Sequence, residues 1–340
     1  MDIISPKERI LRVLSKEKVD RPPVVCPGGM MNAAIVDVMN KTGHTLPEAH
    51  HDDKLMAELS SDVHAHTGFE NFGIPFCMTV EAEVLGSEIN FGTLACEPKI
   101  AKEVFPSVSK VEYKDIHQVL KQGRVDTIIQ AGYYLSKKYP DVPVIGNLTG
   151  PISTAASIVD PMPFLKELRK DRKNAHKLID YVTDFLIEYA RLMIDNGATL
   201  ISVGDPTATG EILGPKMFEE YAVRYLNKLI DGIHSVSAPV IVHICGNMNM
   251  VKPLIPGIRS NAISTDALVN LRLLKEEFPT LTTMGNLSTF LLELGTPEKV
   301  SGQTMRLLND GIDIISPACG LSTSSSLDNI QALTRTVKES

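Results

Sequence analysis

From about residue 140 onward, the sequence alternates between short apolar runs and amphipathic helical stretches, and this alternation limits the possible folds more than any other feature. Gly, Asn and Asp residues mark the ends of the runs. The predicted strands cover residues 142–146, 198–204, 239–245, 262–266, 281–285 and 312–317. Strands that alternate with helices pair in parallel and are covered by those helices.

We predict a single (β/α)8 TIM barrel over residues 1–340, with an amino-terminal helical extension in residues 1–20. Residues 24–26 and a stretch near 77–84 raise the number of strands to eight, although residues 72–91 also suit an inserted hairpin. A length of 340 residues fits such a barrel, which typically needs about 250 before insertions. The competing fold is a doubly wound sheet, but no G-x-G-x-x-G follows a predicted strand.

The first residues have the signature of a helix start. Ser5 is placed to cap it, Pro6 suits the first turn, and Glu8 completes an S-x-x-E capping box. Pro22 and Pro23 are expected to end this helix and lead into the apolar run at residues 24–26.

Composition and charge exclude several classes of function. The 34 Lys and Arg residues against 41 Asp and Glu give a net charge of −7, which disfavours nucleic acid as the main ligand. The chain has no apolar stretch long enough for a membrane span, and its first residues lack the apolar core of a signal peptide. Five cysteines are too few for a disulfide framework. We expect a soluble, cytoplasmic protein.

Four residues form the strongest candidate site. His243 and Cys245 are two apart in the predicted strand VIVHIC and therefore point to the same face. Cys319 follows a later predicted strand, and Asp266 ends the strand between them. In a barrel all four lie on the carboxyl-terminal rim, where barrel enzymes keep their active sites.

Imidazole, two thiolates and a carboxylate make a plausible tetrahedral zinc set, and ligands from separate strands favour a catalytic over a structural ion. The alternative for the cysteines is packing as small buried side chains, and Asp266 also suits a loop cap. Two thiolates and a carboxylate would leave zinc electron-rich. Such an ion suits deprotonation of an incoming thiol and S-alkylation better than hydrolysis.

Asn147, Asp205 and Asn286 also end predicted strands, so we predict that they line the substrate pocket, although each also suits a loop cap. Gly28 and Gly29 mark either a close approach to a ligand or a turn. The His cluster in the first 70 residues favours polar surface over a second metal site: His44, His50, His51, His64 and His66. Asp62-Val-His64 departs from the corrinoid-binding D-x-H-x-x-G signature at Thr67. We therefore expect no corrinoid carried by this chain itself.

The sequence resembles the methylcobalamin:coenzyme M methyltransferases of the uroporphyrinogen decarboxylase superfamily. The likeness runs nearly end to end through PKERILRVLSKEKVDRPPVV, LPEAHHDDKLMAEL, GIPFCMTVEAEVLGSEINFGT, VIGNLTGPIS, ISVGDPTAT, VHICGN, MGNLSTFLLELGTPEKV and GIDIISPACGLS. HICG and PACG are the most specific parts, because zinc ligation in that family uses an H-x-C and a later Cys.

The resemblance implies a (β/α)8 barrel with zinc on His243, Cys245 and Cys319, and an acidic residue, here Asp266, as a less certain fourth ligand. It also implies that a methylated corrinoid protein supplies the methyl group as methylcobalamin. The acceptor would be a small thiol such as coenzyme M.

Three alternatives remain open. In the first, the methyl group comes from the same corrinoid donor but passes to another acceptor, such as tetrahydrofolate. Uroporphyrinogen decarboxylase shares the fold, but its paired arginines in an R-x-A-G-R-Y-like loop are missing from the matching CPGGMMNAAI. The third alternative is a non-catalytic corrinoid-binding or partner-binding barrel with a structural zinc.

Overall fold

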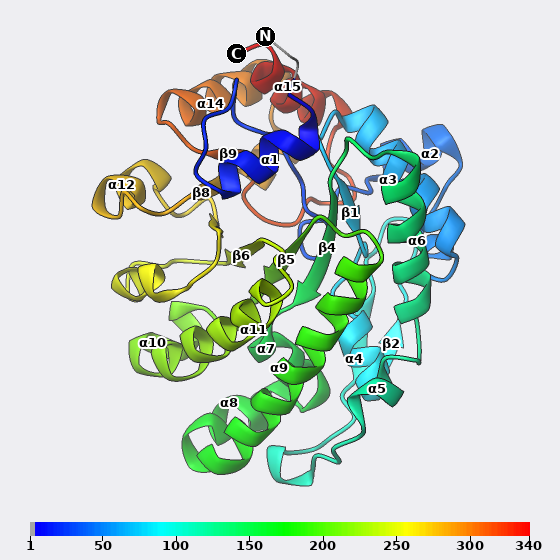
Figure 1. Ribbon diagram of the computed structural model, residues 1–340, viewed down its shortest axis with the longest axis vertical. Helices are drawn as coiled ribbons and strands as arrows, with labels where there is room; N and C mark the ends of the chain where they lie inside the picture. The colour runs from blue at the N-terminus through cyan, green and yellow to red at the C-terminus, as the bar shows by residue number, and fades with distance from the viewer. Residues whose placement is uncertain (1–3) are drawn as a thin grey trace.

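The computed structural model describes residues 4–340, which build a curled sheet of seven parallel strands surrounded by helices (Figure 1). The strands are β1 (Phe72–Ile74), β4 (Val144–Thr149), β5 (Leu200–Gly204), β6 (Val240–Ile244), β7 (Ala262–Thr265), β8 (Thr283–Leu287) and β9 (Ile314–Pro317). Their order in the sheet is their order in the sequence, so no strand order reverses, as it would in a doubly wound sheet.

The eighth place of the barrel is filled by the segment around Val24, which joins β9 to β1. The Val25 amide donates to the Ile315 carbonyl and the Ile315 amide to Pro23. On the other side, the Asn71 side chain accepts from the Cys26 amide and donates to the Cys26 carbonyl. The expected (β/α)8 architecture is therefore confirmed, with one very short strand that pairs partly through a side chain.

Helices cover the outside of the barrel between successive strands. They are α1 (Pro6–Leu14), α2 (Val36–Thr42), α3 (Asp53–Thr67), α4 (Val80–Leu85), α5 (Ile116–Val119), α6 (Val125–Lys138), α7 (Pro151–Ile158), α8 (Pro161–Lys170), α9 (Arg172–Asp195), α10 (Gly210–Met217), α11 (Arg224–His234), α12 (Leu271–Glu277), α13 (Thr289–Leu294), α14 (Pro297–Asn309) and α15 (Leu327–Lys338). Between β6 and β7 the connection contains only a 3₁₀ segment, η4 (Lys252–Gly257). None of the helices within residues 4–340 combines the length and apolarity that a bilayer span requires.

The first half of the barrel differs from the expectation. The stretch near residues 77–84 is not a strand: it leads into helix α4, which ends at the left-handed Gly86. The barrel strand lies earlier, at β1, and Pro75 follows it directly. An inserted hairpin is present, but it consists of β2 (Glu88–Asn90) and β3 (Lys99–Lys102) and begins later than predicted.

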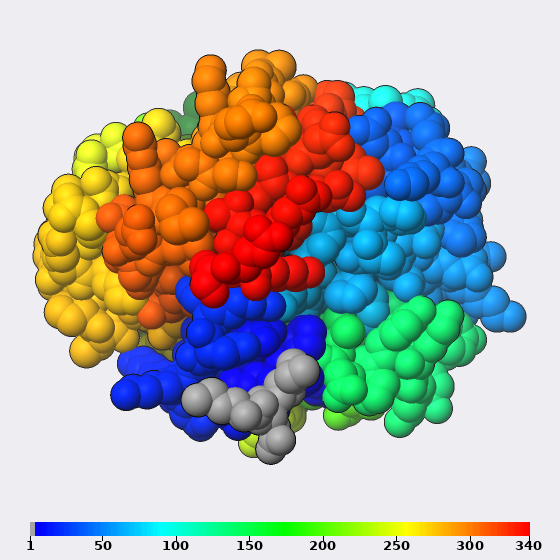
Figure 2. All heavy atoms as spheres, turned by 90° about the horizontal axis from the view of Figure 1, so that it is seen from above, coloured from blue at the N-terminus to red at the C-terminus, as the bar shows by residue number. Residues whose placement is uncertain are grey.

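The amino-terminal helix lies at the end of the barrel where the strands begin. Ser5 caps it by accepting a hydrogen bond from the Glu8 amide, as predicted, whereas the Glu8 carboxylate pairs with Arg12. The helix ends at Leu14, before the two prolines that were expected to stop it. Seen from above, this segment (blue) lies beside α15 (red), at the lower edge of the view (Figure 2).

A buried ion network fastens the amino-terminal segment to the barrel. Arg9 donates to Glu70 at 2.9 Å, and Arg21 donates to both Glu70 oxygens at 2.6 and 2.9 Å. The Glu70 carboxylate also accepts from the Val24 amide, beside the segment that closes the barrel. Burial raises the pKa of Glu70, but the hydrogen bonds from Arg21 and Val24 and the two positive charges outweigh it, so that the pKa is lowered overall.

We predict that Glu70→Gln lowers the free energy of unfolding by about 3 kcal/mol at pH 7, because it removes the buried carboxylate that Arg9 and Arg21 share and leaves Arg9 only the half-exposed Asp20 as a counter-charge. Since the folded pKa lies below the ordinary value of 4.5, the contribution of Glu70 is present above that pH and is lost as the pH falls. Urea unfolding at a series of pH values measures both effects.

The matched control is Glu8→Gln, which removes a carboxylate from an exposed pair on α1 and should change stability by less than about 0.5 kcal/mol. Equal effects of the two substitutions at pH 7 would show that the Glu70 network does not stabilise the fold.

Candidate metal centre

Three predicted residues meet at the carboxyl-terminal end of the barrel. His243 is the fourth residue of β6, Cys245 follows that strand directly, and Cys319 follows β9. One possible ligand atom from each residue lies within 4.8 Å of the other two. The strands are parallel, so their carboxyl ends share one edge, and this brings together residues that are 74 positions apart.

The spacing of the three donors fits a tetrahedral zinc ion. The His243 Nε2 lies 3.3 Å from the Cys245 Sγ, and the two sulfurs are 3.8 Å apart. Two sulfurs bound tetrahedrally at about 2.3 Å would be roughly 3.8 Å apart, and a nitrogen and a sulfur roughly 3.6 Å. Three protein donors also leave a fourth position, which is the arrangement of catalytic zinc sites.

The surroundings of the donors support this use. The His243 ring is buried, and its Nδ1 lies 2.9 Å from the Ser264 hydroxyl, which orients the ring and leaves Nε2 toward the sulfurs. A hydrogen bond from Cys245 lowers the pKa of Cys319, and the nearby His243 lowers it further. The same hydrogen bond, burial and the charge of Asp266 raise the pKa of Cys245. The two thiols therefore titrate as a coupled pair in which the charge of one disfavours the charge of the other, and a divalent cation would allow both to be charged.

Asp266 lies next to this cluster without being one of its three donors. One carboxylate oxygen is 3.4 Å from the Gly246 amide, directly after Cys245, and the other accepts from the Leu268 amide at 3.0 Å. The structure thus places the predicted fourth ligand on the rim beside Cys245, with both oxygens turned to backbone amides.

The three residues predicted to line the pocket hold the barrel rim together. Asn147 is inside β4 and donates to the carbonyls of Pro27 and Ile74. Asn286 is inside β8 and donates to the carbonyls of Asp266 and Val269, which fixes the loop after β7.

Asp205, directly after β5, caps helix α7. Its carboxylate accepts from the amides of Ile152 and Ser153 and from the Ser153 hydroxyl. Burial raises the pKa of Asp205 to about 6 against the lowering effect of these hydrogen bonds.

The glycine pair after the first short strand has a structural explanation. Gly28 and Gly29 both have positive φ angles, and a side-chain carbon at either position would lie within 3 Å of Asn147. The close approach is therefore to the barrel's own β4. This path brings the next residue, Met30, to the metal centre, where its sulfur lies 3.9 Å from the Cys245 Sγ.

The histidines of the first 70 residues make other contacts. His44 pairs with Asp62 and Glu58 on the surface of α3, and the His64 Nδ1 lies 2.7 Å from the Phe69 carbonyl oxygen. His50 is fully buried, and desolvation lowers its pKa to about 3.

Sequence reasoning missed Ser264, Met30 and the β2–β3 hairpin as parts of this site. Ser264 is the register partner of His243 on β7, so the alignment of the two predicted strands was a usable signal. Met30 carried no comparable signal. It comes from a loop whose course depends on the barrel being closed.

The β2–β3 hairpin reaches the loop that follows Cys319. The Thr323 hydroxyl donates to the Ala95 carbonyl at the hairpin tip. Two residues further on, Glu97 has a pKa raised to about 7, because desolvation and the negative charge of Cys77 and Cys319 disfavour its charged form. The geometric link between the hairpin and the metal centre is the contact of its tip with the loop that follows Cys319.

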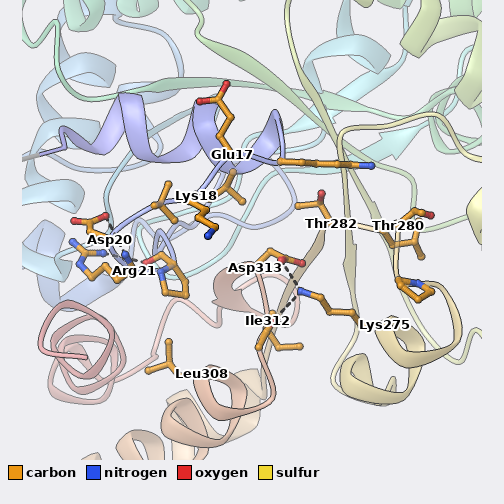
Figure 3. Close-up of a pocket in the computed structure, with 17 residues that line it drawn as sticks. Glu17, Lys18, Asp20, Arg21, Lys275, Thr280, Thr282, Leu308, Ile312 and Asp313 are labelled. Atoms are coloured by element: carbon orange, nitrogen blue, oxygen red, sulfur yellow. Dashed lines mark hydrogen bonds and ion pairs between the residues drawn. The ribbon is translucent and has the colours of Figure 1, made fainter.

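A cleft of about 670 Å³ lies at the opposite end of the barrel (Figure 3). It is bordered by the segment after α1 and by the residues that lead into β8 and β9. Within it, the Lys275 ammonium donates to the Asp313 carboxylate and to the Gly311 carbonyl. Strand β9 separates Asp313 from Cys319, so this cleft is separate from the metal centre.

Comparison with known families agrees with the fold. The family model described as uroporphyrinogen decarboxylase (URO-D) matches residues 5–340. The chain belongs to the uroporphyrinogen decarboxylase family.

Within the URO-D family, a methylcobamide:CoM methyltransferase MtbA of Methanosarcina acetivorans is 34% identical over 98% of both chains. A methylcobamide:CoM methyltransferase MtaA of Methanosarcina barkeri is 29% identical over 96% of both. The resemblance inferred from the sequence is thereby confirmed.

Two solved structures share the fold of this URO-D family member. A methyltransferase from Methanosarcina mazei superposes with a TM-score of 0.92 at 29% identity and covers 99% of both chains. A B12-independent methionine synthase from Shewanella shares the fold, with a TM-score of 0.57 at 14% identity over 94% of this chain and 98% of its own.

We predict that Cys245→Ala and Cys319→Ala each weaken zinc binding by at least about 100-fold, because each removes a sulfur donor from the three-donor set. Zinc content after dialysis, measured by mass spectrometry, checks this. Ser264→Ala should have a smaller effect of about 10- to 100-fold in affinity, since it removes only the partner of the His243 ring.

His234→Ala is the matched control, because His234 is an exposed possible donor at the end of α11, outside the cluster. Zinc retained at full stoichiometry by both Cys245→Ala and Cys319→Ala would rule out this metal centre.

Proposed function

We propose that this protein transfers a methyl group from a methylated corrinoid to a thiol such as coenzyme M, with zinc bound by His243, Cys245 and Cys319. The observation that carries the proposal is the convergence of these three donors at the carboxyl-terminal rim. The relatives named methylcobamide:CoM methyltransferases, similar over nearly the whole chain, support the same donor and acceptor.

The residues of the chain have separate tasks in this proposal. Ser264 orients His243, while Cys245 and Cys319 provide negative charge that makes the site rich in electrons. When bound, zinc supplies the acidity that deprotonates a thiol at neutral pH. The thiol sulfur then bonds to the methyl carbon as the carbon–cobalt bond breaks. The electron pair of that bond stays with cobalt, and the thiol proton is released.

Other parts of the rim position these groups. We propose Asp266 as a displaceable fourth donor whose position the incoming thiol would take, because its loop lies against Gly246, next to Cys245. Asn286 holds this loop, and Asp205 and Asn147 hold the neighbouring loops, so we propose that these three act on the substrate pocket through the loops they fix.

The alternatives have less support. The loop after Val25 has no arginine for the carboxylates of uroporphyrinogen, and a uroporphyrinogen decarboxylase of Myxococcus xanthus matches only 30% of this chain. A purely structural zinc would be expected to have four protein donors, whereas three converge here. If tetrahydrofolate were the acceptor, the reaction would not need a site that activates a thiol.

We predict that the zinc-loaded protein consumes methylcobalamin when coenzyme M is added, which is measured as loss of the methyl–cobalt absorption. A chelator should abolish the reaction, and zinc should restore it. Cys245→Ala should lower the rate to background, while His234→Ala should retain it.

The acceptor is tested in parallel with tetrahydrofolate, and decarboxylation with uroporphyrinogen. Methyl loss with tetrahydrofolate alone, or undiminished transfer by metal-free protein, would contradict the proposed mechanism.

We further predict that Asp266→Ala lowers zinc affinity by about 10-fold or more and slows methyl transfer. Zinc titration against a competing chelator, together with the methylcobalamin assay, measures both. If affinity and rate stay at the level of the unsubstituted protein, Asp266 is not a donor and the three-residue site stands without it.

A further inference from the structure

Several large apolar side chains are exposed on this protein. The most exposed are Leu294 at 77%, Phe290 at 75%, Leu268 at 73%, Met162 at 63% and Met250 at 60%. Clustered exposure of this kind on a folded protein marks an interaction site, because apolar surface in contact with water is unfavourable.

Four of these side chains come from three neighbouring connections. Met250 follows β6, Leu268 follows β7, and Phe290 and Leu294 are on α13, which follows β8. The three strands are adjacent and parallel, so the connections leave the barrel at the same edge. We call these four residues the apolar collar.

Two residues of the apolar collar follow residues of the metal centre closely along the chain. Leu268 is two residues past Asp266, and its amide donates to the Asp266 carboxylate. Met250 is five residues past Cys245. A cleft of about 400 Å³, bordered by Leu268 and Leu291, lies between the loop after β7 and helix α13.

The charged side chains around the collar pair with one another. Arg272 contacts Glu276 and Asp310, and Lys252 pairs with Glu277. With these charges paired, the collar offers apolar contact without a strong field of either sign. An association here would therefore not depend on the net charge of −7, which would repel another acidic protein.

We infer that the apolar collar is the docking surface for the protein that carries the methylated corrinoid. This inference rests on the proposed function. A thiol is small enough to reach the barrel mouth alone, whereas a corrinoid held by a carrier can reach the metal centre only if the carrier touches the rim. A small apolar patch suits a carrier that must leave after each transfer, because transient contacts bury little area.

The test compares two methyl donors on the zinc-loaded protein with coenzyme M as acceptor. One is free methylcobalamin, and the other is a methylcobamide-loaded corrinoid protein. The test variant is Phe290→Gln with Leu294→Gln, since glutamine keeps helix propensity while removing apolar surface. The control is Tyr133→Gln with Met305→Gln, both 43% exposed and located on α6 and α14 outside the collar.

We expect the collar variant to lower kcat/KM for the corrinoid protein by about tenfold or more, through a higher KM, because apolar anchors dominate such contacts. Its rate with free methylcobalamin should stay within about twofold of the unsubstituted protein. The control variant should change neither.

Unchanged kinetics with the corrinoid protein would overturn the docking inference, as would an equal loss in the control. If the unsubstituted protein uses free methylcobalamin but no corrinoid protein, the inference fails while the proposed function stands. If it uses neither donor, the proposed function itself fails. Light scattering that shows a dimer dissociated by the collar substitutions, with unchanged donor kinetics, would instead assign the collar to a second copy of this chain.

Discussion

The whole site depends on the parallel alignment of β6, β7 and β9, which puts their carboxyl ends at one edge of a closed barrel. No local segment contains the metal centre: His243 and Cys245 come from one strand and Cys319 from another, far along the chain. Closure is completed by the short segment around Val24, which is held by backbone hydrogen bonds to β9 and by the Asn71 side chain. The Glu70 network lies at this seam, so the charges that stabilise the fold also maintain the geometry of the distant rim.

The two ends of the barrel differ in the balance of their charged groups. At the amino-terminal end, acidic and basic groups neutralise each other, as in the pair of Lys275 with Asp313. At the carboxyl-terminal end, two thiols meet one imidazole beside the Asp266 carboxylate, which favours a cation. Burial makes this imbalance costly in the absence of an ion, because a low-dielectric interior disfavours unpaired charge. The same imbalance would be useful in a reaction that needs an electron-rich sulfur.

Much of this arrangement was predictable from the sequence, for definite reasons. Regular alternation after residue 140 allowed the strands of the second half to be placed to within a few residues, and H-x-C at a strand end predicted two donors on one face. The first half was harder, because its barrel strand has three residues and the segment after it becomes helical at α4. Asn147 and Asn286 were expected at strand ends, yet they lie inside strands and bind loop carbonyls, a role that depends on tertiary contacts. Met30 and the hairpin reach the site only through long-range packing.

The hydrogen bond between Thr323 and the tip of the β2–β3 hairpin has a consequence for how such an enzyme can diversify. The hairpin is an insertion whose two strands pair only with each other, so its length and sequence can change without disturbing the hydrogen bonds of the barrel strands. Because its tip contacts the loop that follows Cys319, such a change would alter the surroundings of the candidate metal centre. Selection for a new acceptor can therefore act on the hairpin without changing the strands that position the candidate metal ligands.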